Sequence, residues 1–133
     1  MKKAIVVGLL LMVAVLGFAE LSPEARAIRS TFPEGFAFIM ETAEADWPGD
    51  YAMQTYAVNR QSEAFFEAMD IMTADGGFDD NIMIQAMLDW SEFSTFATMS
   101  AGMKAGGTLG ARCDWTMVVY QYKLQFDSKM GLR

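Results

Sequence analysis

The sequence contains no histidine and only one cysteine, Cys113. The absence of histidine removes the usual general base of enzymes, the Ser–His and Cys–His nucleophile pairs, and most zinc, haem and di-iron sites. A lone cysteine cannot form a disulfide within the chain, so stability must come from buried apolar surface unless a metal or an oligomer contributes. We expect Cys113 to be buried as a small apolar side chain, with an intermolecular crosslink as the alternative.

Basic residues are also scarce, because ten lysines and arginines stand against 17 aspartates and glutamates, a net charge of −7. Nucleic-acid-binding proteins need clusters of Lys and Arg to neutralise phosphate, and this composition offers none. The same charge gives no electrostatic attraction to a membrane that carries anionic lipid. We therefore expect no nucleic-acid partner and no membrane binding once the N-terminal segment described next has been removed.

The first nineteen residues have the three parts of a secretory signal. Lys2 and Lys3 provide a basic start, residues 4–18 are apolar without interruption, and Gly17 and Ala19 place small residues before Glu20. The apolar stretch of 16 residues to Ala19 is short for a membrane span, which needs roughly 20 residues. Residues 1–19 are thus predicted to be a cleaved signal peptide, with a retained anchor as the alternative. The product is exported to the periplasm or the medium, and loss of the two lysines leaves it eight basic and 17 acidic residues, a net charge of −9.

Three clusters rich in glycine or proline divide the remaining chain, at residues 47–49, 75–78 and 105–110. The pieces between them are too long for ordinary strands. Ser22 before a proline, Asp50, and Asp79 or Asp80 are suitable helix N-caps, and Pro33 is expected to divide the first piece into a short and a longer helix. Residues 20–133 are therefore predicted to form a single all-α domain, a small up-down-up-down four-helix bundle.

The last piece, residues 115–127, fits two interpretations. As a helix it places Trp115, Val118, Tyr122 and Phe126 on one stripe. As a strand its residues alternate and are good strand formers, but no partner strand is visible elsewhere in the chain. We favour the helix and keep the strand as the alternative, because such a strand could pair edge to edge in a homodimer.

Methionine is unusually frequent, and ten of the 114 residues after the predicted signal are Met. The third piece spreads methionines and aromatic residues over more than one helix face, which is more apolar surface than one small core needs. Methionine gives adaptable surfaces for apolar partners. The predicted binding residues for a protein partner or apolar ligand are Met83, Met87, Trp90, Phe96, Met99 and Met103.

The same residue type suggests a second chemistry. Copper(I) selects soft thioether and thiolate ligands, and several methionines recur at i,i+3 or i,i+4 spacing, which places them on one helix face. The corresponding ligand candidates are Met83, Met87, Met99, Met103, Cys113 and Met117.

The favoured function is that of an exported, acidic, non-catalytic binding protein that needs no cofactor. Copper(I) binding is the first alternative. The second is a small enzyme that works with carboxylates alone, since two carboxylates can perform acid and base chemistry without histidine. With 17 acidic residues, spacing nominates no particular pair. A homodimer is compatible with each of these functions.

Overall fold

The computed structural model describes residues 20–132, and the predicted signal peptide at residues 1–19 lies outside them. The described chain is all-α, with six α-helices, one short 3-10 helix and no strand. The elements are α2 (Pro23–Thr31), α3 (Pro33–Asp46), α4 (Tyr51–Thr73), α5 (Asp80–Asp89), α6 (Phe96–Gly106), η1 (Thr108–Ala111) and α7 (Trp115–Gly131).

The predicted helix starts are confirmed by their capping hydrogen bonds. The Ser22 hydroxyl accepts from the backbone N–H of Ala25 at 3.1 Å, and the Asp50 carboxylate accepts from that of Met53 at 3.1 Å. Asp79 is the cap of α5, and Pro33 is the first residue of α3. Side-chain acceptors at these positions satisfy backbone donors that have no partner within the helix.

The third piece forms two helices, α5 and α6, where a single helix was expected. The Ser91 hydroxyl accepts from the backbone N–H of Phe93, and Thr95 caps α6 by accepting from that of Thr98. Ser91 also forms an isolated bridge with Cys113. Local side-chain hydrogen bonds of Ser and Thr compete with helical ones, so the chain turns between the two apolar stretches instead of continuing.

The last piece is a helix, α7, so the favoured interpretation of residues 115–127 is confirmed. Asp114 caps it by accepting from the backbone N–H of Met117 at 3.3 Å. The edge-paired homodimer considered above would need a strand here, and the segment is helical.

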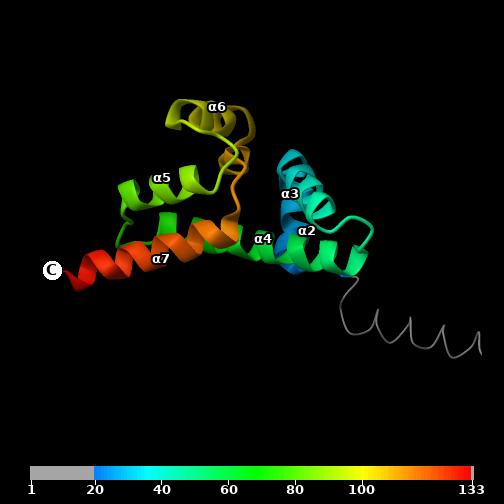
Figure 1. Ribbon diagram of the computed structural model, residues 1–133, viewed down its shortest axis with the longest axis horizontal. Coiled ribbons are helices and arrows are strands. Elements are labelled where there is room, and N and C mark those ends of the chain that lie inside the picture. Colours follow the sequence, from blue (N-terminus) through cyan, green and yellow to red (C-terminus); the bar gives the residue numbers. More distant parts are fainter. Residues whose placement is uncertain (1–19, 133) are drawn as a thin grey trace, which may run out of the picture.

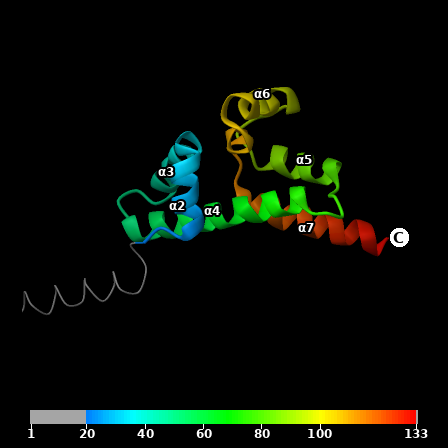
Figure 2. The same cartoon turned by 180° about the vertical axis from the view of Figure 1, so that it is seen from behind.

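The helices are arranged along α4, whose 23 residues span about 35 Å at 1.5 Å per residue. Helices α2 and α3 pack on the N-terminal half of α4 (Figures 1 and 2). We call α2, α3 and this half of α4 the N-terminal region. Helix α7 lies against the other half of α4, α5 packs on α7, and α6 is joined mainly to η1. These elements form the C-terminal region.

The buried apolar side chains form one cluster that draws on both regions. The up-down-up-down four-helix bundle is not confirmed: the described residues form six helices, of which α2, α3 and α7 pack on α4, α5 packs on α7, and α6 is held at the edge by η1. Within residues 20–132, no helix combines the length and the apolar character that a membrane span requires.

Candidate functional site

An apolar groove lies between α5 and α6, and we call it the methionine groove. Its volume is about 390 Å³. Five methionines line it: Met83 and Met87 from α5 and Met99 and Met103 from α6, which we call the four groove methionines, and Met72 near the end of α4. The other lining residues are Phe78, Asp80, Ile84, Phe96, Ser100 and Lys104.

The lining changes from a closed floor to an open rim. Met83, Met87 and Met99 are almost completely buried, at 1%, 3% and 1% exposure, while Phe96 remains 52% exposed. Helices α5 and α6 share few backbone contacts, so unbranched methionine side chains fill the space between them. The groove is therefore lined by flexible, polarisable side chains, and its two walls come from helices that are loosely joined.

Helix α6 is held in place by a close contact between two glycines. A Cβ atom on Gly110 would lie 2.2 Å from the carbonyl oxygen of Gly102, and one on Gly102 would lie 2.5 Å from that of Gly110. Only glycine allows backbones to approach so closely. The glycine-rich stretch after Met99 thus anchors α6 on η1 and sets the position of one wall of the groove.

Two charged residues lie toward opposite ends of the groove. The ring of Phe93, which follows α5, lies against Gly102, so the second half of α6 is beside the C-terminal end of α5. Lys104 is in the last turn of α6 and so lies near the C-terminal end of α5. Asp80 is in the first turn of α5, at the opposite end of that helix. Both side chains are exposed and neither forms an ion pair within residues 20–132.

The structure brings five of the six predicted binding residues together, namely Met83, Met87, Phe96, Met99 and Met103. Trp90 lies elsewhere: its indole N–H donates to the Gln121 side chain at 2.7 Å, outside the groove. Met72, Phe78, Ile84 and Lys104 also line the groove, although the sequence patterns did not mark them as site residues. The hydrophobic periodicity of a segment shows which of its residues share a helix face, but it carries no information on which helices border the same cavity.

The predicted copper ligands divide into two groups. Met83, Met87, Met99 and Met103 line the groove, but Cys113 and Met117 do not. The Cys113 thiol is buried and donates to the backbone carbonyl of Met87 at 3.4 Å, as expected for an apolar role. Burial, together with the Asp114 charge, raises the pKa of Cys113 to about 12, so the thiolate that binds metals is disfavoured.

Among residues 20–132, no three His, Cys, Asp or Glu side chains are grouped as a metal site would require. A metal site in this part of the chain would therefore depend on the thioether sulfurs of the four groove methionines.

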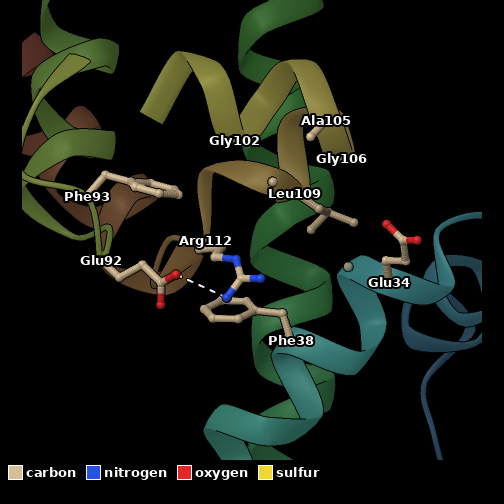
Figure 3. A pocket seen from close by; sticks show the side chains of 11 residues that line it. Glu34, Phe38, Glu92, Phe93, Gly102, Ala105, Gly106, Leu109 and Arg112 are labelled. Carbon is tan, nitrogen blue, oxygen red and sulfur yellow. Dashed lines mark hydrogen bonds and ion pairs between the residues drawn. The ribbon is translucent and has the colours of Figure 1, made fainter. Parts of the chain in front are cut away.

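A second cavity separates the two regions, and we call it the interregion cleft (Figure 3). It has a volume of about 340 Å³ and is bordered by α3 on one side and by Phe93, Leu109 and Arg112 on the other. The guanidinium of Arg112 lies over the Phe38 ring, 5.0 Å from its centroid, and pairs with Glu92 at 3.1 Å. Leu109 packs against Gly35, where a Cβ would lie 2.6 Å from it.

Arg112 is the one non-glycine residue with positive φ, at 53°, in the described chain. This left-handed conformation is unfavourable for a residue with a Cβ atom. It aims the Arg112 side chain across the cleft toward Phe38, so Arg112 joins the two regions. Nothing in the local sequence signals this backbone conformation at an arginine.

The interregion cleft also brings two carboxylates to one cavity, Glu34 from α3 and Glu92 from the segment after α5 (Figure 3). Both side chains are exposed, and Glu92 is already engaged by Arg112. General acid–base catalysis needs a group whose environment tunes its proton affinity and whose side chain is free to reach a substrate. The cleft provides the carboxylates but leaves one of them in an ion pair.

Comparison with known proteins finds no match to this chain among family models, curated proteins or solved structures. Its function must therefore be argued from its own residues.

Proposed function

We propose that this is an exported, non-catalytic binding protein that takes an apolar ligand in the methionine groove. The observation that carries the proposal is the convergence of four methionines from α5 and α6 on one apolar cavity of about 390 Å³. Ligand sites in proteins are concave, mostly apolar and few in number, with a small number of polar groups at fixed places.

Methionine suits such a site, because its unbranched side chain adapts to ligands of different shape and its sulfur is polarisable. The few contacts between α5 and α6 support the same function, because side chains fill the space between these two helices. Export through residues 1–19 remains part of this proposal. It predicts a mature protein that begins at Glu20, which N-terminal sequencing of the secreted material would test.

The binding function is tested with a neutral apolar dye, N-phenyl-1-naphthylamine, whose fluorescence rises in an apolar site. We expect saturable binding that weakens when Phe96→Ala removes a half-exposed ring from the groove wall. Tyr56→Ala is the matched control, because Tyr56 is 55% exposed on α4 and lines none of the cavities described above. Equal loss in both variants, or no saturable binding, would contradict the proposal.

Copper(I) binding is a second candidate, supported by the five thioethers that line one cavity, four of them from α5 and α6. Replacing Met83, Met87, Met99 and Met103 together by Leu keeps the apolar volume and removes every thioether of that set. If the function is apolar binding, this variant retains dye binding; if it is copper handling, the variant loses affinity for copper(I) in competition with a chelator. The two measurements on one variant therefore separate the candidates.

A further inference from the structure

We infer that the ligand of the methionine groove is a straight-chain amphiphile with a carboxylate head, held with its head beside Lys104 and its chain along the methionines. This inference rests on the proposed function and names the class of ligand. Its basis is the placement of a single cation at one end of a groove whose remaining lining is almost entirely apolar.

The charge of Lys104 gives the groove a direction. The residue lies in the last turn of α6, and no carboxylate of residues 20–132 lies within ion-pair distance of it. The three N–H donors of the ammonium group are therefore available to an external anion. Within residues 20–132 the two other lysines are paired, Lys123 with Glu67 and Lys129 with Asp79. The hydroxyl of Ser100, one turn before Lys104, is a second donor on the same wall.

The size of the groove suits a single chain. A volume of about 390 Å³ lies within the range of roughly 300–1,000 Å³ that is usual for small-molecule sites. Methionines from α5 and α6, together with Phe78 and Met72, supply most of the apolar lining. Each methylene that leaves water for this lining is expected to raise affinity by up to about fourfold, until the groove is full.

Asp80 lies toward the far end and opposes binding in the reverse direction. A carboxylate head placed there would meet a like charge, which is unfavourable. The two charged residues therefore favour one orientation of a carboxylate ligand.

The experiment measures displacement of the neutral dye by dodecanoate, dodecanol and dodecylammonium, each below its micelle concentration and at low salt. We expect dodecanoate to bind about two- to fivefold more tightly than dodecanol, the range for an ion pair at a solvent-exposed site. Dodecylammonium is expected to bind most weakly.

Three variants locate the head group. Lys104→Met keeps the apolar stem and should bring the affinity for dodecanoate down to that for dodecanol, while dodecanol changes less than about twofold. Arg29→Met, which removes the same charge from exposed α2 in the N-terminal region, should keep the preference for the acid. Asp80→Asn should change the preference for dodecanoate over dodecanol by less than about twofold, because the carboxylate head lies beside Lys104 at the opposite end of the groove.

The outcomes separate the inference from the function it rests on. If dodecanol and dodecanoate bind the wild-type protein equally, the carboxylate inference is overturned but the apolar binding function stands. If the wild-type protein prefers dodecylammonium and Asp80→Asn abolishes that preference, the inferred carboxylate head group and its placement beside Lys104 are both overturned. If none of the three displaces the dye, or the dye itself does not bind, the groove is not a ligand site and both proposals fail.

Discussion

The N-terminal and C-terminal regions share α4 but differ in the side chains that pack their helices together. In the N-terminal region, α2 and α3 close on α4 with small or branched side chains, and Ala25, Ile28 and Val58 have no exposed surface. In the C-terminal region the buried cluster adds Phe65, Trp115 and three methionines to its alanines and valines, and α6 shares few contacts with α5. Small side chains let helices approach closely, whereas long flexible ones fill a space that a ligand can also occupy.

The proposed binding site lies in the region where α5 and α6 share few contacts. Local regions of low contact density are those from which ligand-binding elements are usually drawn. The predictions that follow test whether the two regions differ in the way their packing indicates, beginning with the largest expected effect.

The aromatic core of the C-terminal region depends on Trp115. Its ring packs edge to face on Phe65, with centroids 5.2 Å apart, and its backbone N–H donates to the Gln61 side chain at 2.8 Å. Trp115→Ala should lower the free energy of unfolding by about 3–5 kcal/mol in denaturant titration. Tyr120→Ala, on the exposed face of the same helix, should change it by less than about 0.5 kcal/mol.

The N-terminal region offers the matching test. Ile28→Val removes one methylene from a site with no exposed surface and should cost about 0.5–1.5 kcal/mol. It should leave dye binding in the methionine groove unchanged. A change in dye affinity would show that the two regions are coupled more closely than their packing implies.

The contact between Gly102 and Gly110, which anchors α6 on η1, is tested by its effect on stability and on dye affinity. Gly110→Ala forces a Cβ into the backbone of Gly102 and should cost about 1–3 kcal/mol while altering dye affinity, because one wall of the groove shifts. The control is Gly106→Ala, where no atom lies within 4 Å of the added Cβ. That variant should be neutral or more stable by about 0.4–1 kcal/mol. Similar dye affinities for Gly110→Ala and the wild type would mean that η1 does not set the groove.

Arg112 tests the link between the regions. Arg112→Ala loses the contacts with Phe38 and Glu92 but keeps the left-handed backbone, and it should cost about 1 kcal/mol, since these contacts are half exposed. Arg112→Gly loses the same contacts but relieves the backbone, a gain of about 1 kcal/mol. The glycine variant should therefore unfold at higher denaturant concentration than the alanine variant. The reverse order would show that the backbone at Arg112 is not strained.

The smallest effect concerns pH. The hydrogen bond from Lys129 to Asp79, followed by that from the backbone N–H of Ile82, lowers the pKa of Asp79 below its ordinary value. A carboxyl whose pKa is lower in the folded protein stabilises the fold above its ordinary pKa, and this contribution disappears as the pH falls through the lowered value. Lys129→Met should therefore reduce the melting temperature at pH 7, with a difference that shrinks toward pH 3 and below.

Arg29→Met is the control for the pH experiment, because Arg29 has no carboxylate within ion-pair distance in the described chain. Its melting temperature relative to wild type should vary little over the same range. A Lys129→Met difference that persists in strong acid would contradict the assigned role of the Asp79 pair.

Much of the local structure could be predicted from the sequence. Ser22, Asp50 and Asp79 are the caps expected from their side chains, since capping depends on residues only three positions apart. Val58 and Phe65 of α4 are buried, as the helical periodicity of apolar residues in that segment indicates. The turn at 90–95 was missed because two apolar stretches joined by short polar residues have nearly the periodicity of one helix.

The sequence by itself determined the helical class, the starts of α2, α3, α4 and α5, the acidic charge and the frequency of methionine, because each of these depends on composition or on neighbouring residues. Only the tertiary structure decided that Met83 and Met87 face Met99 and Met103 across a groove, that Lys104 lies at one end of it, and that Arg112 bridges the regions. The reason is physical: the break after α5 and the contact between Gly102 and Gly110 bring these residues together, and both arise from long-range packing that local patterns do not encode.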